Sequence, residues 1–107
     1  KTENQNNVGQ TETEQGIASF YSPSLKGAKT ASGESYDPEQ LTAAHKTLPF
    51  GTLVKVENIE SGKWVQVRIN DRGPYVEGRV IDLSTSAFEA LAPLSRGLTN
   101  VKLTIQS

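Results

Sequence analysis

The sequence predicts a mostly β domain with one or two short helices. Short runs in which apolar and polar residues alternate recur along the chain, and turns rich in Gly and Pro separate these runs. No internal repeat is present. A chain of 107 residues is long enough for one hydrophobic core but not for two, so a single small domain is expected.

Residues 1–15 are expected to form a flexible polar tether. Val8 is their only aliphatic residue, so this segment cannot bury enough apolar surface to offset the entropy of ordering its backbone. The composition changes at residues 16–21, a short β-prone run, and the folded domain is therefore expected to span residues 16–107. Residues 24–33 lack periodicity and are rich in Gly, Ser, Thr and Lys, which predicts an exposed loop of the kind that often borders a site.

Period-two alternation predicts a central hairpin. In residues 53–58, Val54 and Val56 alternate with charged residues, the pattern of a half-buried strand. A turn at residues 60–63 follows, and residues 65–69 alternate in the same way. The two runs are therefore expected to pair with each other.

The second half of the chain predicts two more strands and a short helix. A tight turn at residues 71–74 must redirect the chain, because Pro cannot continue a central strand. Residues 79–83 predict a strand, and residues 84–86 offer N-cap candidates for a short helix that is closed by Pro93. Alternation over residues 101–105 predicts a closing strand whose pairing hides a sheet edge.

Charge and composition narrow the range of partners. Eleven basic and twelve acidic side chains give a formal net charge of -1, which lacks the excess of cations that nucleic-acid binding requires. Without cysteine and with a single histidine, neither a metal site nor another cofactor is expected. No run approaches the roughly 20 apolar residues of a membrane span, so no transmembrane segment is expected. We expect a monomer.

Five blocks of sequence, taken together and in order, carry a family resemblance. The blocks are GIASFY at 16–21, TASGESYD at 30–37, TAAHKTLPFGT at 42–52, NDRGP at 70–74 and RVIDLS at 79–84. They resemble the double-psi β-barrel of the rare lipoprotein A family, which are septal lytic transglycosylases, and cover nearly all of the predicted domain. A single block would be weak evidence for the family, because the conformational needs of a turn also favour residues such as those of NDRGP.

The resemblance implies both a fold and an activity. The fold is a six-stranded double-psi β-barrel. The activity is that of a cofactor-independent lyase, an endolytic lytic transglycosylase that cleaves the MurNAc–GlcNAc bond of peptide-denuded glycan strands and forms 1,6-anhydro-MurNAc. The implied partner is therefore the peptidoglycan glycan strand, and the implied location is the bacterial cell envelope, after export to the periplasm or cell surface.

The resemblance also singles out residues for a site. Asp82 matches an aspartate in expansins and, more distantly, the second essential aspartate of membrane-bound lytic transglycosylase A. Glu34, His45 and Asp71 complete the implied catalytic set. The residues implied to contact the glycan are Tyr21, Asp37, Lys46, Arg72 and Tyr75.

Glycosidic cleavage needs an acid that protonates the leaving oxygen. Free Asp titrates near a pKa of about 4, so a catalytic Asp needs burial or neighbouring negative charge to stay protonated near neutral pH. Our hypothesis is that Asp82 is both acid and base and that Asp71 raises its pKa or orients it. Glu34 and His45 would position the glycan and stabilise charge.

Each candidate also has a structural interpretation. Asp82 lies just before a helix N-terminus, and Asp71 lies in a turn. A lone histidine such as His45 is commonly a hydrogen-bonded structural residue, and Glu34 suits a solvated loop. Trp64, at a strand start, is expected to be a partly buried packing residue rather than a sugar platform.

Two other functions fit the same sequence. One is a non-catalytic, expansin-like module that binds or loosens wall polysaccharide. The other is an inverting hydrolase, in which a second carboxylate activates water from about 6.5 to 9.5 Å away. The family commonly carries a C-terminal glycan-binding repeat and a lipidated cysteine that anchors it to the outer membrane, and neither feature lies within these 107 residues. Septal targeting, lipid anchoring, the exact substrate and the identity of the acid therefore stay open at this point.

Overall fold

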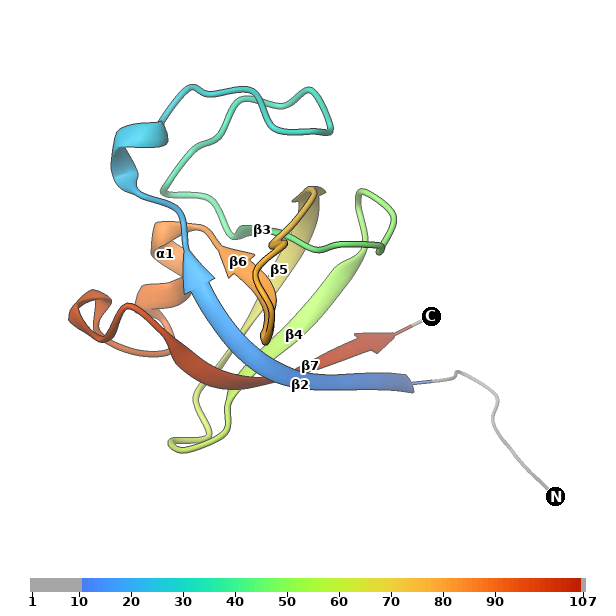
Figure 1. Cartoon of the computed structure of the whole chain (residues 1–107), viewed down its shortest axis with the longest axis vertical. Helices are drawn as coiled ribbons and strands as arrows, with labels where there is room; N and C mark the ends of the chain where they lie inside the picture. The colour runs from blue at the N-terminus through green and yellow to red at the C-terminus, as the bar shows by residue number, and fades with distance from the viewer. Residues whose placement is uncertain (1–10, 107) are drawn as a thin grey trace, which may run out of the picture.

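Six strands close into one barrel in the computed structural model, which describes residues 11–106 (Figure 1). In chain order the elements are β2 (Thr11–Phe20), η1 (Pro23–Leu25), β3 (Thr42–Ala44), β4 (Leu53–Asn58), β5 (Trp64–Asp71), β6 (Arg79–Leu83), α1 (Thr85–Glu89), η2 (Leu94–Arg96) and β7 (Thr99–Gln106). Around the barrel the order is β2-β6-β3-β5-β4-β7. The pairs β2–β6 and β3–β5 are parallel and the other four are antiparallel. This architecture confirms the predicted six-stranded, mostly β barrel.

The central hairpin follows the predicted alternation. Val54 and Val56 of β4 are buried, and Leu53 and Lys55, which alternate with them, are exposed. β5 pairs antiparallel with β4 in the register that sets Val54 opposite Val67. Inward-facing side chains from both strands therefore meet in the barrel core.

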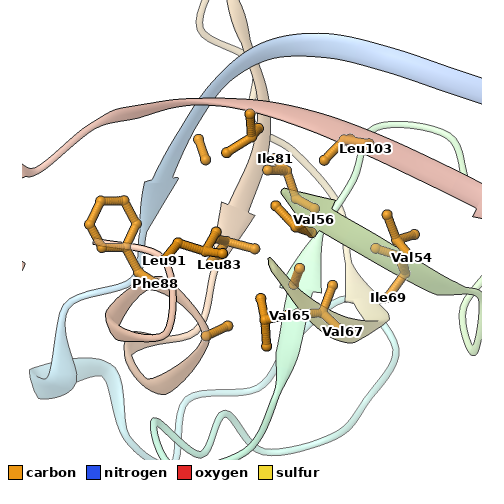
Figure 2. Close-up of a cluster of buried hydrophobic side chains, with 14 of the residues drawn as sticks. Val54, Val56, Val65, Val67, Ile69, Ile81, Leu83, Phe88, Leu91 and Leu103 are labelled. Carbon is orange, nitrogen blue, oxygen red and sulfur yellow. The ribbon is translucent and has the colours of Figure 1, made fainter. Parts of the chain in front are cut away.

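The core fills the barrel and continues under α1. Figure 2 shows labelled side chains of β4, β5, β6 and β7 and of the α1 region converging on one interior, and the same core includes Ala18 of β2 and Ala43 of β3. The largest fully buried apolar side chains are Phe88, Ile69, Ile81, Leu83, Leu91, Leu103, Val54, Val56, Val67 and Val101. Each is an inward position of a strand or lies in or just after α1, so burial of apolar surface holds the barrel closed.

The helix α1 closes one end of the barrel. Its N-cap Ser84 accepts a hydrogen bond from the backbone N–H of Ala87 at 3.3 Å, as the N-cap prediction requires. Phe88 is fully buried and its ring lies 4.7 Å from that of Phe20 on β2. The helix therefore ties the end of β6 to the end of β2.

The structure corrects the predicted start of the domain. Residues 11–15, expected in the tether, belong to β2 and pair antiparallel with β7, from Thr11 opposite Gln106 to Gln15 opposite Lys102. Figure 1 shows the two strands running side by side. The backbone hydrogen bonds between paired strands do not require apolar side chains. The Glu12–Gln15 stretch is polar and exposed, so its sequence lacks the alternation of apolar residues that would predict a strand. The rest of the predicted tether lies outside the described residues.

One strand had no sequence signal. β3 has three residues, too few to show a period, and all three are buried. It nevertheless lies between β6 and β5 and pairs with both. This position makes β3 the centre of the candidate site.

The predicted loop is present and stands off one end of the barrel (Figure 1). Residues 22–29 are exposed, and Lys29 bridges to Ser35 within the loop. Backbone hydrogen bonds join Gly27 to Tyr36 at 2.8 Å and Tyr36 to Ala28 at 2.7 Å. In residues 11–106 no helix has the length and apolar character needed to cross a membrane.

Candidate active site

The strand register brings two predicted aspartates to the same edge. Ala44 of β3 pairs with Asp71 of β5 on one side and with Asp82 of β6 on the other. Asp82 in turn pairs with Ser19 of β2. Because neighbouring strands are about 4.8 Å apart, the two aspartates lie about 10 Å apart at their Cα atoms. Two aspartates eleven positions apart in the chain thus flank one buried alanine.

Asp71 is held by three hydrogen bonds. Its Oδ1 accepts from the backbone N–H of Ala31 at 2.7 Å and of Arg72 at 2.9 Å, and its Oδ2 accepts from the Tyr21 hydroxyl. Both carboxyl oxygens are therefore occupied. The contact with Ala31 also fixes the loop of residues 22–41 to the end of β5.

Asp82 has one occupied and one available carboxyl oxygen. Its Oδ1 accepts from the Ser19 hydroxyl and from Nη2 of Arg79, the latter at 3.1 Å. Its Oδ2 has no hydrogen-bond partner in residues 11–106, and the side chain is 18% exposed. Asp82 is thus anchored on one side and open on the other.

Tyr21 connects the two aspartates electrostatically. Burial, the hydrogen bond to Asp71 and the charges of Asp71 and Asp82 together raise the pKa of Tyr21 far above its ordinary value. Its hydroxyl is therefore protonated and acts as a donor. Its ring packs at 4.9 Å against Tyr36, whose hydroxyl lies 3.2 Å from Thr85 Oγ1.

Glu34 binds two side chains of β5, the strand that ends in Asp71. Its carboxylate accepts two hydrogen bonds from Arg68, at 2.7 and 3.0 Å, and one from the Asn70 amide at 3.1 Å. The bonds from Arg68 and then Asn70 lower the pKa of Glu34. Glu34 is therefore ionised at neutral pH, and its charge is matched by Arg68 rather than directed at Asp82.

His45 is buried and organises a turn. Its Nδ1 accepts from the backbone N–H groups of Thr47 and Leu48 at 3.1 and 3.2 Å, so the proton of the neutral ring sits on Nε2. That nitrogen lies 3.0 Å from Glu14 Oε1. Its ring contacts match the structural interpretation. The link to the aspartates is through the main chain, where His45 N donates to the Asp71 carbonyl at 3.2 Å.

The remaining predicted contact residues are spread around this edge. Asp37 caps its own loop by accepting from Glu39 N at 3.0 Å. Lys46 is exposed and Tyr75 is 77% exposed. The guanidinium of Arg72 stacks on the Phe50 ring at 4.2 Å and donates to the His45 carbonyl at 3.1 Å.

Sequence reasoning missed several contributors. Ser19 contacts Asp82 through the register of β2 with β6, and Arg79 contacts it from three residues earlier in β6. Glu14 lies in the stretch assigned to the tether. Phe50 belongs to a quoted block but had no assigned role. One sequence signal could have identified Ser19. It lies between Ala18 and Phe20 in β2, and because successive side chains of a strand point to opposite faces, Ser19 points away from the barrel core.

The expectation for Trp64 is wrong. Its side chain is 59% exposed, with the Lys55 ammonium 5.0 Å from the ring centroid. Trp64 precedes the buried Val65, and successive side chains of a strand point to opposite faces. It therefore faces outward. Within the described part of the chain, no three His, Cys, Asp or Glu side chains are grouped so that they could hold a metal ion.

Sequence comparison with known proteins identifies the family of this chain. The model of the family described as "Lytic transglycolase" matches residues 13–103. The probable endolytic peptidoglycan transglycosylase RlpA of Synechocystis is 57% identical over 90 residues, which are 84% of this chain and 28% of that protein. The chain spans about a quarter to a third of the length of the curated relatives it matches.

Two solved structures share the fold of this chain. The Streptomyces papain inhibitor has a TM-score of 0.68 and 27% identity, covering 92% of this chain and 96% of the inhibitor. An expansin of Clavibacter michiganensis has a TM-score of 0.69 and covers 90% of this chain and 50% of the expansin. At 24% identity the expansin supports the fold alone. The family match over residues 13–103 and the identity to RlpA show that this chain belongs to the lytic transglycolase family, with the double-psi β-barrel that its sequence predicts.

Proposed function

We propose that this barrel is the catalytic domain of an endolytic peptidoglycan lytic transglycosylase. It acts on peptide-denuded glycan strands, cleaves between MurNAc and GlcNAc, and leaves a 1,6-anhydro-MurNAc end. Family membership and the names of the relatives support this proposal. The observation that carries it for this chain is the placement of Asp71 and Asp82 on either side of Ala44.

Asp82 is the acid and the base in this proposal. Of the six carboxyl oxygens of Glu34, Asp71 and Asp82, only Oδ2 of Asp82 has no hydrogen-bond partner in the described residues. Protonated there, Asp82 gives its proton to the glycosidic oxygen, and the bond from that oxygen to MurNAc C1 breaks. The C6 hydroxyl of the same MurNAc then bonds to C1 and returns its proton to Asp82. No water is consumed.

Asp71 and Tyr21 supply fixed electrostatics. An oxocarbenium-like centre carries positive charge, and a carboxylate that is already oriented stabilises it without reorganisation. Asp71 meets this requirement because three donors hold it. In the proposal Glu34 and His45 shape the surrounding loops, through Arg68 and Glu14 respectively.

Digestion of peptide-free glycan strands tests the proposal. Mass spectrometry of the products should show anhydro-MurNAc ends with the unaltered protein and intact strands with Asp82→Asn. Glu89→Gln, an exposed acid on α1, is the matched control and should cleave normally. Reducing ends would instead identify a hydrolase, and bound but intact strands would identify an expansin-like module. Either result would overturn the proposal.

The proposed substrate places the protein in the bacterial cell envelope. Export to the periplasm or cell surface, lipid anchoring at the outer membrane and a monomeric state belong to the same proposal. Fractionation of cells checks the location, and light scattering of the purified chain checks that its mass in solution is that of one copy, 11.6 kDa.

A further inference from the structure

Three of the four arginines in the sequence pair with carboxylates. Arg68 lies 2.7 Å from Glu34, Arg79 lies 3.1 Å from Asp82 and Arg96 lies 3.3 Å from Glu60. Arg72 is the exception, with no carboxylate partner in residues 11–106. It is also the arginine that follows Asp71 directly in the chain.

Arg72 is held in place without a counter-charge. Its backbone N–H donates to Asp71 Oδ1 at 2.9 Å, and its Nη1 donates to the carbonyl of His45 at 3.1 Å. Its guanidinium lies 4.2 Å from the ring centroid of Phe50. Nε and Nη2 have no hydrogen-bond partner in the described residues. One edge of the guanidinium is therefore available, and its orientation is fixed in advance.

The Phe50 ring, on which the Arg72 guanidinium stacks, is held in position by its neighbour Gly51. The neighbouring Gly51 has a φ of 95°, a conformation that favours glycine, and its N–H donates to the Ile69 carbonyl at 2.8 Å. This bond ties the loop that carries Phe50 to β5. Phe50 is 44% exposed, so part of its ring stays open to a ligand.

A planar guanidinium with a free edge suits a carboxylate, which it binds through two parallel N–H···O bonds. In a peptidoglycan strand, muramic acid is the sugar that carries a carboxylate, on the lactyl ether at C3. This group is free and anionic when the stem peptide is absent. It becomes a neutral amide when the peptide is attached. The lactyl group is therefore the carboxylate nearest the bond that the proposed reaction breaks.

We propose that Arg72, stacked on Phe50, is the receptor for the free lactyl carboxylate of muramic acid. The proposal rests on the proposed function and deepens it, because it assigns the preference for peptide-free strands to one side chain beside Asp71. An amide at the same position leaves the free edge of Arg72 without its anion.

The test compares three strands of equal length. The first is peptide-free, the second is peptide-free with its lactyl carboxylates converted to amides by carbodiimide and ammonia, and the third carries stem peptides. Binding and kcat/KM are measured for the unaltered protein, Arg72→Gln, Arg72→Lys and the control Arg96→Gln. Arg96 pairs with Glu60, outside the candidate site.

We expect the Arg72 variants to lose affinity only for strands that carry the free lactyl carboxylate. Arg72→Gln should weaken binding to peptide-free strands by about tenfold or more, with Arg72→Lys in between and Arg96→Gln unchanged. The unaltered protein and Arg72→Gln should bind amidated strands equally. The comparison of free with amidated strands uses the unaltered protein, so equal binding overturns the proposal even if Arg72→Gln unfolds. In that case Arg72→Lys, which keeps the charge, assigns the loss to this side chain.

Two results would overturn this inference. Equal binding of free and amidated strands by the unaltered protein would show that the protein does not recognise the lactyl carboxylate. An equal loss by Arg72→Gln on peptide-bearing strands would assign the recognised carboxylate to the peptide. Failure of the proposed function looks different: no strand acquires anhydro ends, while the binding measurements still decide the role of Arg72.

Discussion

At the scale of single residues, the site depends on which polar atoms are already occupied. Asp71 has both oxygens bound, Glu34 is paired with Arg68, and Asp82 keeps Oδ2 available. Sequence similarity placed all three in one group of acids. Hydrogen bonding separates them into an oriented carboxylate, an ion pair and, in our proposal, the acid whose available oxygen meets the substrate.

Tyr21→Phe tests the orientation of Asp71. The change removes the hydroxyl that donates to Asp71 and leaves the ring that packs on Tyr36. Loss of a hydrogen bond to a charged group costs about 1.5 kcal/mol, which corresponds to about a tenfold lower kcat on peptide-free strands. Tyr36→Phe is the control, since its hydroxyl bonds Thr85 rather than an acid. Equal kcat for Tyr21→Phe and the unaltered protein would exclude this role.

Glu34→Gln tests the ion pair with Arg68 through pH. The pKa of Glu34 is lowered in the folded state, so the pair stabilises the fold above the unfolded pKa of about 4.5, and this contribution is lost as pH falls through the folded pKa. Because both side chains are more than a third exposed, solvent screening keeps the effect below about 1 kcal/mol. Urea unfolding should show Glu34→Gln as less stable at pH 7 and equal to the unaltered protein near pH 2. A difference that persists at low pH would contradict the assignment.

At the scale of elements, close strand approach sets the register that builds the site. A Cβ on Gly16 of β2 would lie 2.4 Å from Cγ1 of Val80 on β6. β2 and β6 also carry Ser19 and Asp82 as register partners. The glycine therefore permits the spacing on which the contact between Ser19 and Asp82 depends.

Gly16→Ala should destabilise the barrel by about 1 to 3 kcal/mol, the range typical of overpacking. Combining it with Val80→Ala removes the clashing methyl groups, so the double variant should be more stable than the sum of the single changes predicts. Denaturant unfolding of the four proteins measures this coupling. Strict additivity would show that the two side chains do not meet.

Hydrogen exchange tests the corrected start of β2. If residues 11–15 pair with β7, the amides that face Lys102–Gln106 should exchange far more slowly than those of an unfolded chain. A tether predicts unprotected amides throughout residues 11–15. The exchange rates resolved by NMR distinguish the two.

At the scale of the whole molecule, the sequence predicts the strands that show a regular alternation of apolar residues. It does not predict contacts between residues that are distant in the chain and are brought together by strand pairing. Alternating valines predicted β4, β5 and the core, and the family blocks predicted the barrel. β3 was too short to show a period, and the pairing of Thr11–Gln15 involves backbone rather than apolar burial. The contacts of Asp82 with Ser19 and of His45 with Glu14 join residues far apart in the chain, and they follow from strand pairing that no local pattern encodes.

In the proposed reaction the barrel breaks the MurNAc–GlcNAc bond by internal transfer, without water. Digestion of peptide-free strands in H₂¹⁸O tests it most directly, because a hydrolase must place solvent oxygen at C1 of each new end. We predict new anhydro-MurNAc ends that carry no ¹⁸O, and none with Asp82→Asn. New reducing ends labelled with ¹⁸O would contradict this mechanism.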